Sequence, residues 1–288
     1  MNFDDFIQAA LDEDIKDGDH STLCCIPPET KGTAILKVKE NGILAGVAVA
    51  QRILQLVEPQ ASITIYLEDG YEVQKGDLAF EIKASVHTIL KTERLILNIM
   101  QRMSGIATLT RAYVNKLSGY AATLLDTRKT TPNFRWFEKE AVRIGGGQNH
   151  RMGLYDMIML KDNHIDFCGG IEKAIDAANN YLKLTKKNLA IEVETRSIDD
   201  VKRVVAHGGV QRIMFDNFSV DLMKEAVLLV PSHIETEASG GITLDSISSY
   251  AATGVQFISA GAIIHHAVSM DLSLKAVISA RVHPIFLY

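Results

Sequence analysis

The sequence has little cysteine, proline or tryptophan, and it contains no long uninterrupted apolar run. Its 288 residues include 3 cysteines, 6 prolines and 1 tryptophan. Cys24, Cys25 and Cys168 are too few for the disulfide framework of a small secreted domain, and they are typical of reduced thiols in a cytoplasmic protein. No apolar stretch reaches the roughly 20 residues that span a bilayer, and the acidic N-terminus lacks the apolar core of a signal peptide. We therefore expect a cytoplasmic protein with no membrane segment.

The charge balance is mildly acidic and the apolar content is high. Lysine and arginine total 30 against 35 aspartate and glutamate residues, which gives a formal net charge of −5. That balance argues against a nucleic-acid-binding protein, so any basic cluster is expected to be local and to serve a small anion. Because 47% of the residues are hydrophobic, the chain can bury a sizeable core. Its length fits one large domain or a large and a small one.

The second part of the sequence alternates short apolar runs with helical patterns. Six runs have the composition of buried parallel strands, at 121–126, 156–160, 189–194, 212–215, 234–238 and 255–259. Helical patterns lie between most of them, at 171–184, 198–207, 220–229 and 244–253. Repeated βα units predict a parallel sheet, and six or more favour an α/β barrel.

The first part of the sequence has a different pattern. It predicts an amphipathic helix over 3–12, a strand over 33–40, a helix over 47–57, a strand over 61–67 and one long helix over 86–117. We therefore expect an N-terminal α+β sandwich domain with its long linking helix over 1–117 and a barrel domain over 118–288. The C-terminal tail is a candidate to pack on the first domain.

Polar residues follow the predicted strands at one end. The strands are followed in turn by DTRKT at 126–130, KDNH at 161–164, DN at 216–217, SGG at 239–241 and AGA at 260–262, and the third strand carries Glu192 and Glu194. The carboxyl ends of parallel strands hold the chemistry in α/β folds. Cations come with the early strands and carboxylates with later ones, which chance does not readily produce. The pattern predicts an active site at this end of the sheet.

Six cationic side chains are candidates to bind an anion: Arg102, Arg128, Lys129, His150, Arg151 and Lys161. Several cations on one rim repel one another unless a multiply charged anion lies between them, and arginine suits two-point contacts to carboxylate or phosphate. His150 and Arg151 stand between a glycine-rich segment and a buried strand, so we predict that both contact a ligand. His164 is expected to cap or orient its loop, and Arg111 and Arg135 are expected to be solvated surface charges.

Three carboxylates form a second group. Glu192 and Glu194 are two apart on a strand, so both point to one face, and Asp216 ends the next strand. Together they predict Mg²⁺, a sugar diol or salt bridges to the cations, and the salt-bridge alternative is stronger for Glu192 than for the other two. The glycine-containing segments 239–241 and 260–262 predict a phosphate site built from backbone N–H groups.

Several longer motifs are characteristic of one family. DTRKTTP occupies 126–132 and GGGQNHRMGLYDMIMLKDNHI occupies 145–165, with shorter matches at 18–22 (GDHST), 238–242 (ASGGI) and 259–262 (SAGA). In these motifs, and almost from end to end, the chain closely resembles the quinolinate phosphoribosyltransferases, also called nicotinate-nucleotide pyrophosphorylases (carboxylating). Asn133 departs from the glycine that the family often has there. The resemblance implies an N-terminal α/β sandwich, an incomplete TIM-like α/β barrel and at least a homodimer.

The resemblance also implies a reaction and a role for each site residue. Quinolinate and phosphoribosyl pyrophosphate would give nicotinate mononucleotide, pyrophosphate and CO₂, with Mg²⁺, in NAD biosynthesis. The residues that it places around quinolinate are Arg102, Arg128, His150, Arg151 and Lys161. Those that it places at the phosphoribosyl pyrophosphate are Thr127, Lys129, Glu194 and Asp216, with Ser239, Gly240, Gly241, Ala260, Gly261 and Ala262 around the 5-phosphate. Lys161, Glu194 and Asp216 are the expected catalytic residues, and Glu194 and Asp216 the expected metal ligands, directly or through water or pyrophosphate.

The long helix adds a hypothesis about assembly. Its apolar residues cover more of its circumference than one core-facing stripe needs: Leu95, Ile96, Leu97, Ile99, Met100 and Met103. A second apolar surface would then be available to a partner subunit. Because Arg102 lies among these residues, we predict that it reaches the substrate of a neighbouring subunit. Dimer and hexamer are both compatible with the sequence.

Three other interpretations stay open from the sequence. A Schiff-base lyase on the same barrel would use Lys161 or Lys129 as its nucleophile. A non-catalytic phosphosugar-binding sensor would bind its ligand without turnover. A paralogue of the same family that is associated with molybdenum transport would share the fold, although the full DTRKTTP and NHRMGLYD segments favour the quinolinate enzyme.

Overall fold

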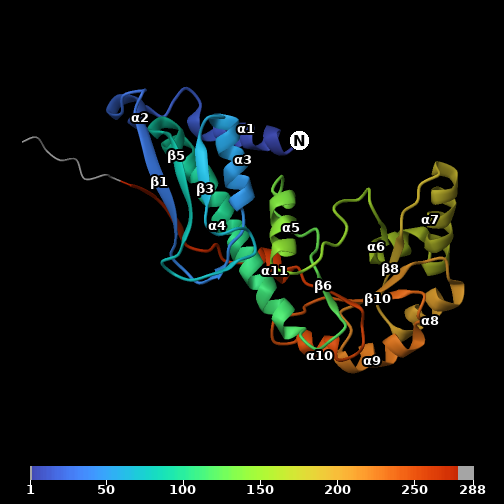
Figure 1. The fold of residues 1–288 in the computed structure, drawn as a ribbon. Helices are drawn as coiled ribbons and strands as arrows, with labels where there is room; N and C mark the ends of the chain where they lie inside the picture. The colour runs from blue at the N-terminus through green and yellow to red at the C-terminus, as the bar shows by residue number, and fades with distance from the viewer. Residues whose placement is uncertain (1, 278–288) are drawn as a thin grey trace, which may run out of the picture. The chain divides into compact units, whose positions relative to one another are not determined.

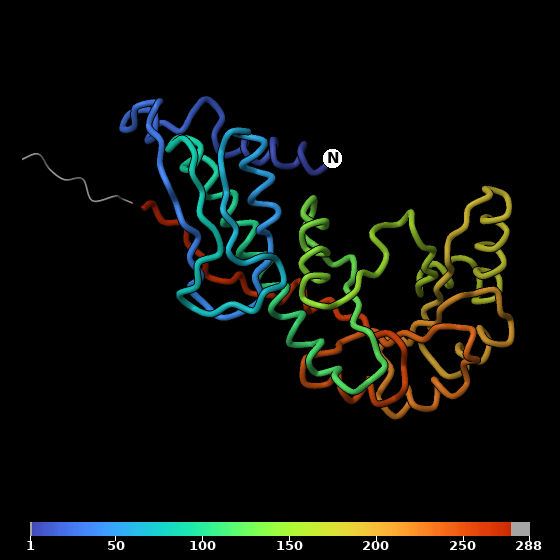
Figure 2. Tube along the Cα trace, viewed as in Figure 1, coloured from blue at the N-terminus to red at the C-terminus, as the bar shows by residue number. Residues whose placement is uncertain are grey.

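The computed structural model describes residues 2–277, which fall into two compact units. The first contains the described residues up to Thr108 and those from Val268 onward, and the second is Leu109–Ala267. The sequence analysis placed the boundary after residue 117, assigned 118–288 to the barrel domain and named the C-terminal tail as a candidate to pack on the first domain. The division differs because the chain returns to the first unit after Ala267, as the red end of the trace in Figure 2 shows.

An antiparallel sheet of four strands, in the order β12-β1-β5-β3, is the framework of the first unit. Its strands are β1 (Lys31–Val38), β3 (Ser62–Ile65), β5 (Leu78–Ser85) and β12 (Leu272–Ala276), and a separate two-stranded sheet pairs β2 (Gly42–Ile43) with β4 (Glu72–Val73). Its helices are α1 (Phe3–Ile15), α2 (His20–Cys25), α3 (Val47–Val57) and most of α4 (Val86–Lys116). Along β1 the buried residues are Ala34, Leu36 and Val38, so one face of the strand supplies core and the other does not.

Helix α4 uses its wide apolar circumference inside the single chain. Ile96, Leu97, Ile99, Met100 and Met103 are each 4% exposed or less, and only Leu95 of the six apolar residues considered above is half-buried. The expectation that these residues leave a second apolar surface for a partner subunit is therefore wrong. The apolar circumference is wider than a single core-facing stripe because the same chain buries more than one face of the helix.

Six parallel strands form the centre of the second unit, in the order β6-β11-β10-β9-β8-β7. Their bounds are β6 (Thr123–Leu125), β7 (Ile158–Leu160), β8 (Ile191–Thr195), β9 (Arg212–Asp216), β10 (Glu235–Ser239) and β11 (Phe257–Ser259). The first strand pairs with the last, as in a barrel, but β6 and β7 do not pair with each other anywhere in residues 2–277. The predicted incomplete α/β barrel with a smaller N-terminal domain is confirmed, and all six predicted strands are present.

Helices lie around the outside of these strands, as Figure 1 shows for α7, α8, α9 and α10. The helices of this unit are α5 (Arg135–Ile144), α6 (Asp162–Cys168), α7 (Ile171–Thr185), α8 (Ile198–His207), α9 (Val220–Leu229), α10 (Ile247–Ala251) and α11 (Ala262–His265). Helices α8 and α9 have the predicted bounds because Ser197 and Ser219 cap them, each accepting a hydrogen bond from a backbone N–H three residues on. No helix over 2–277 is both long enough and apolar enough to cross a membrane.

Candidate active site

A cavity of about 710 Å³ opens at the carboxyl ends of the parallel strands, within the second unit. Every site residue that was predicted in this unit lines it: Thr127, Arg128, Lys129, His150, Arg151, Lys161, Glu194, Asp216, Ser239, Gly240, Gly241, Ala260, Gly261 and Ala262. The structure therefore brings together residues that are up to 135 positions apart in sequence (262 − 127). Arg102 lies on α4 in the first unit, so the geometry of this cavity does not test its assignment.

The loop after β10 brings bare backbone to the cavity. Gly240 has a φ of 96°, and a Cβ atom on it would lie 2.3 Å from the Asn217 Oδ1 atom, so no other residue fits there. Gly241 has a φ of 61°, and nothing lies within 4 Å of the place where its Cβ would be. With Ala260–Ala262 on the neighbouring loop, these residues form the part of the cavity where a phosphate could approach the main chain.

Two arginines in the cavity lack a carboxylate partner. Neither Arg128 nor Arg151 forms an ion pair within residues 2–277, and the Nε atom of Arg128 is buried with no hydrogen-bond partner there. The Arg151 guanidinium donates from Nη1 to the Met157 carbonyl at 3.3 Å. Burial and the neighbouring Arg128 lower the pKa of Arg151. An anion with at least two negative charges would relieve this repulsion and satisfy the buried donor.

Two carboxylates in the cavity, those of Glu194 on β8 and Asp216 on β9, are candidate oxygen ligands for a metal ion. The Glu194 carboxylate, 7% exposed as a residue, lies 3.5 Å from the Lys161 amine, and the Asp216 carboxylate accepts a hydrogen bond of 2.7 Å from the Asn217 side chain. Both carboxylates line the cavity, and Glu194 keeps one oxygen outside the ion pair. Carboxylate oxygens are what Mg²⁺ prefers, usually with waters and substrate phosphates completing its shell. The residues present therefore fit the predicted ion.

A buried ion pair fixes the segment that carries His150 and Arg151. The Lys139 amine and the Asp126 carboxylate contact each other with at most 1% of either side chain exposed. Asp126 also accepts hydrogen bonds from the backbone N–H of His150 (2.9 Å) and the amide of Asn149 (2.7 Å). Lys139 donates to the His150 carbonyl at 3.1 Å. The backbone N–H and the backbone carbonyl of His150 are thus both bonded to one buried pair.

Two further arginines hold the surrounding loop. Arg111 donates to the Gly145 carbonyl at 2.9 Å, and Arg135 donates to the Thr130 hydroxyl and the Met152 carbonyl. The expectation that both are solvated surface charges is therefore wrong. His164 accepts a hydrogen bond of 3.1 Å from the Lys161 backbone N–H at the start of α6, which confirms its predicted capping role.

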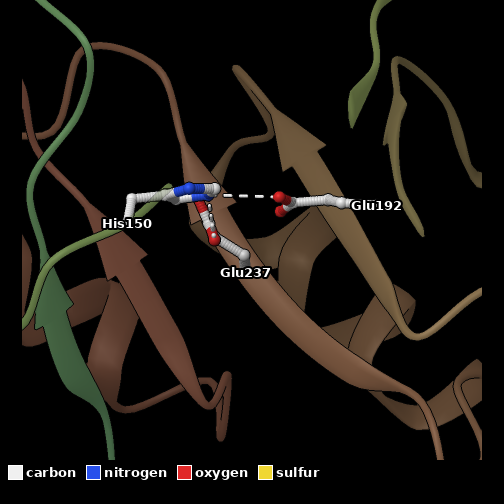
Figure 3. Close-up of side chains that lie close together, drawn as sticks. All are labelled: His150, Glu192 and Glu237. Carbon is white, nitrogen blue, oxygen red and sulfur yellow. Dashed lines mark ion pairs between the residues drawn. The ribbon is translucent and has the colours of Figure 1, made fainter. Parts of the chain in front are cut away.

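His150 and Glu237 both line the cavity, and the His150 ring faces the carboxylates of Glu192 and Glu237 (Figure 3). Its Nε2 atom is 3.1 Å from Glu192 Oε2 and 3.2 Å from Glu237 Oε2, and both glutamates are fully buried. Arg212 then donates from Nη1 to the same Glu237 oxygen at 3.0 Å. We call His150, Glu192, Glu237 and Arg212 the histidine cluster. It shows that the salt-bridge alternative holds for Glu192.

Protons in the histidine cluster are shared. Burial alone would lower the pKa of His150, but Glu192 and Glu237 outweigh it and raise that pKa to about 9. Burial, and then the charge of Glu237, raises the pKa of Glu192. The Nδ1 atom of His150 accepts the Arg151 backbone N–H at 2.7 Å, so that atom needs its lone pair. The ring hydrogen is therefore on Nε2, and the additional proton that the raised pKa values of His150 and Glu192 imply is shared within the cluster. Arg212 balances the remaining charge on Glu237.

The ligating atoms of His150, Glu192 and Glu237 lie within 4.8 Å of one another, which is a spacing that could hold a metal ion. Arg212 already neutralises Glu237, and a histidine nitrogen suits Zn²⁺ better than Mg²⁺. Glu194 and Asp216 are therefore the better magnesium ligands.

Sequence reasoning missed Glu237, Arg212 and Lys139 as site residues. Glu237 carried a usable signal, because an acidic residue at a central position of a buried parallel strand needs a partner. Arg212 and Lys139 carried none, since both stand where surface charges are common. The cavity also reaches Tyr113, His265 and His266, which the sequence motifs did not single out.

An open α/β barrel with an arginine pair, a magnesium-type carboxylate pair and a glycine cradle defines an enzyme that acts on a phosphorylated, multiply anionic substrate. The comparisons with known proteins are more specific. The family model for the C-terminal domain of quinolinate phosphoribosyl transferase matches residues 106–275, and that for the N-terminal domain matches residues 19–104. The chain belongs to the quinolinate phosphoribosyltransferase family.

Individual relatives agree over nearly the whole chain. Quinolinate phosphoribosyltransferase [decarboxylating] 1b of Nicotiana tabacum is 43% identical, over 93% of this chain and 81% of the relative. The probable nicotinate-nucleotide pyrophosphorylase [carboxylating] of Bacillus subtilis is 41% identical, over 93% and 91%. The crystal structure of NadC from Streptococcus pyogenes superposes with a TM-score of 0.89 at 39% identity, covering 96% of this chain and 97% of that one.

Proposed function

We infer that the chain transfers the phosphoribosyl group of phosphoribosyl pyrophosphate to quinolinate and removes CO₂, giving nicotinate mononucleotide and pyrophosphate for NAD biosynthesis. The observation that carries this inference is the Arg128–Arg151 pair, which forms no ion pair with a carboxylate among the described residues and lines a cavity of substrate size. Quinolinate is a dianion on one small ring, which matches two adjacent guanidinium groups. The names of the relatives support the same reaction.

The cavity residues can be assigned to the steps of this reaction. Quinolinate would lie against Arg128, Arg151 and Lys161. As the bond from the ribose C1 atom to pyrophosphate breaks, positive charge grows on the ribose, and the Glu194 and Asp216 carboxylates would stabilise it electrostatically. The quinolinate ring nitrogen then forms the new bond to C1. Since that nitrogen needs no deprotonation, the reaction requires no strong base.

Decarboxylation follows from the charge that the first step creates. Once bonded to ribose, the ring nitrogen is cationic, so it can accept the electron pair left when the adjacent carbon loses its carboxylate as CO₂. That carbon then takes a proton to give nicotinate mononucleotide. The Lys161 amine, held 3.5 Å from Glu194 at the cavity wall, is our candidate to stabilise the carbanion or supply that proton.

The phosphoribosyl end of the cavity has its own set of residues. Thr127 and Lys129 would contact phosphoribosyl pyrophosphate, and the loops 239–241 and 260–262 would hold the 5-phosphate through backbone N–H groups. Mg²⁺ at Glu194 and Asp216, directly or through water, would neutralise charge on the pyrophosphate leaving group. Chelation is expected to abolish turnover, and Asp216→Ala to weaken phosphoribosyl pyrophosphate binding without unfolding. Full activity in chelator would remove the metal from the proposal.

The assembly remains a separate proposal. We propose a homodimer or a higher homo-oligomer in which Arg102 serves the site of a neighbouring subunit, on the basis of the family resemblance. Reassociating equal amounts of Arg102→Ala and Lys161→Ala chains tests it. If sites are shared across a two-fold dimer, random pairing restores roughly a quarter of wild-type sites. Subunit exchange without recovery of activity would contradict a trans arginine.

The alternative functions fit the site less well. A Schiff-base lysine needs apolar surroundings, whereas the Lys161 amine lies beside the Glu194 carboxylate. A sensor would not need the catalytic carboxylates, and the relatives named here are quinolinate enzymes rather than molybdenum-transport paralogues. For the location we keep the cytoplasm as a proposal, supported by three exposed free cysteines, although some plant relatives are named mitochondrial or chloroplastic.

A product assay tests the proposed function. The purified chain with quinolinate, phosphoribosyl pyrophosphate and Mg²⁺ should form nicotinate mononucleotide, CO₂ and pyrophosphate in equal amounts. Product identity is read by chromatography, and CO₂ by label released from the 2-carboxylate. A folded protein that forms no mononucleotide would overturn the assignment, and pyrophosphate release without CO₂ would point to a different acceptor.

A further inference from the structure

Both ring nitrogens of His150 are engaged within the protein. Nδ1 accepts the Arg151 backbone N–H at 2.7 Å, and Nε2 faces the Glu192 and Glu237 carboxylates at 3.1 and 3.2 Å. The residue is 8% exposed. Although His150 lines the cavity, it therefore has no ring nitrogen left over for a substrate carboxylate. Its effect on the substrate must pass through the residue that it holds, which is Arg151.

The two glutamates act on the His150 ring from β8 and β10. Glu192 has no hydrogen-bond partner within residues 2–277, and the Nε2 atom of the His150 ring is the group that it meets at ion-pair distance. Glu237 contacts the ring and is itself held by Arg212, whose guanidinium packs 4.1 Å from the centre of the Phe257 ring. Keeping two carboxylates fully buried is costly. This cost suggests that the two carboxylates have a role beyond packing.

The direction of the coupling follows from the contacts. Carboxylates that face Nε2 at ion-pair distance favour the tautomer with its hydrogen on Nε2, and this leaves the Nδ1 lone pair free to accept from Arg151. The opposite tautomer would place a hydrogen on Nδ1, directly against the Arg151 N–H. The glutamates thereby determine whether the main chain at Arg151 is held or repelled, and the Arg151 side chain extends from there into the cavity.

We propose that Glu192 and Glu237 are positioning residues that act through the His150 ring to hold Arg151 for the dicarboxylate substrate. The proposal rests on quinolinate being that substrate. It adds two fully buried glutamates to the residues that act on quinolinate binding, and it gives His150 a role as a connector. It predicts that changes in the glutamates alter quinolinate binding and leave the phosphoribosyl pyrophosphate end of the cavity unaffected.

The test compares Glu237→Gln with Glu235→Gln. Both glutamates lie on β10 and both accept hydrogen bonds from Arg212, but Glu235 has no contact with His150, so it is a matched control. We expect Glu237→Gln to raise KM for quinolinate at least about fivefold with KM for phosphoribosyl pyrophosphate within about twofold, because the buried group that faces Nε2 loses its charge. Glu235→Gln should leave both constants within about twofold.

A double-mutant cycle tests whether Glu237 affects quinolinate binding through Arg151. Arg151→Lys alone should raise KM for quinolinate, and adding Glu237→Gln to it should cost much less than in the wild-type background, because the residue being positioned is already impaired. The pair Glu235→Gln with Arg151→Lys should be multiplicative. Equal effects of Glu237→Gln on both substrates, or multiplicative effects with Arg151→Lys, would overturn the proposal.

A replacement variant and two further measurements complete the test. If Glu237→Gln does not fold, Glu192→Gln replaces it, because its contact is with the His150 ring and not with Arg212. Wild-type turnover of quinolinate is measured first: its absence overturns the proposed function, whereas wild-type turnover with unchanged variants overturns only the positioning role. Elemental analysis of the purified protein that finds one tightly held Zn²⁺ per chain, lost in Glu237→Gln, would also contradict the proposal in favour of a metal site.

Discussion

The second unit contains two groups of buried or half-buried charges that differ in one respect. In the first group, the Asp126–Lys139 pair and the histidine cluster, each charge has a partner inside the protein. In the second, Arg128 and Arg151 lie near each other and form no ion pair within the described residues. The paired charges join segments that are distant in sequence. The unpaired charges face the cavity.

We expect the paired charges to stabilise the fold and the unpaired charges to bind the ligand. A buried charge with its partner contributes to one defined arrangement of loops, and losing the partner leaves an uncompensated charge in a medium of low polarity. Two neighbouring cations without a partner cost free energy in the empty protein. Such a pair is retained at a site because a ligand supplies the missing negative charge. The predictions below test this division, beginning with the largest effect.

Breaking the Asp126–Lys139 pair should destabilise the protein most. Lys139→Met removes the cation from a fully buried carboxylate and from the His150 carbonyl, so the free energy of unfolding should fall by roughly 3–5 kcal/mol. Urea unfolding followed by circular dichroism measures it. Lys161→Met is the control, because the Lys161 side chain is 48% exposed: we expect a loss of less than about 1 kcal/mol in the free energy of unfolding and a loss of turnover. A Lys139→Met protein as stable as the control would contradict the structural role.

Removing one unpaired cation should weaken binding without weakening the fold. Arg128→Gln leaves the dicarboxylate with one guanidinium fewer, and the lost charged contact of about 1.5–3 kcal/mol predicts a quinolinate dissociation constant at least about tenfold higher. The free energy of unfolding without ligand should stay the same or rise, because the repulsion with Arg151 is gone. Calorimetric titration and urea unfolding on the same samples measure both. A large loss of stability would place Arg128 with the structural charges.

The histidine cluster should make stability depend on pH. The pKa of His150 is raised from 6.5 to about 9 by Glu192 and Glu237 against the opposing effect of burial. A raised pKa in the folded state gives stability that is complete below pH 6.5 and is lost as pH rises through about 9. We expect the wild type to lose roughly 1–3 kcal/mol between about pH 6 and about pH 10, and Glu237→Gln to lose clearly less. Parallel slopes in the two proteins would exclude the cluster as the cause.

A surface ion pair should give the smallest effect. Arg203 and Glu172 join α8 to α7 through two hydrogen bonds of 2.9 and 2.7 Å, but each side chain is 41% exposed. Arg203→Ala should therefore change the free energy of unfolding by less than about 1 kcal/mol and leave turnover at the wild-type level. If it cost as much as Lys139→Met, burial would not be what distinguishes the two kinds of pair.

Much of this architecture could be predicted because local signals and the fold agree. The six strands are apolar runs bounded by polar residues, and Ser197 and Ser219 mark the starts of two helices whose bounds were predicted. The cavity residues could be predicted because parallel strands bring their carboxyl ends together. Strand β12 was missed, since its pairing with β1 depends on a segment 238 residues away (274 − 36) and no turn connects the two.

The residues that hold the site residues in place could not be predicted from the local sequence pattern. Lys139 is one of several charges on α5, and only the packed structure shows that it is fully buried against Asp126. Arg212 and Glu237 become partners because β9 and β10 are neighbours in the sheet, which the sequence alone suggests but does not prove. Helix α4 shows the opposite error, since a wide apolar circumference was taken as spare surface although the same chain covers it.

The most direct test of the unpaired arginines is the ratio of kcat/KM for quinolinate to that for nicotinate in the wild-type protein. Nicotinate has the same ring and one carboxylate fewer, so it leaves one guanidinium desolvated and unpaired. A cost of roughly 1.5–3 kcal/mol predicts a ratio of at least about tenfold in favour of quinolinate. A ratio near one, measured at saturating phosphoribosyl pyrophosphate and Mg²⁺, would contradict the account, because the arginine pair would then not be there to bind a dianion.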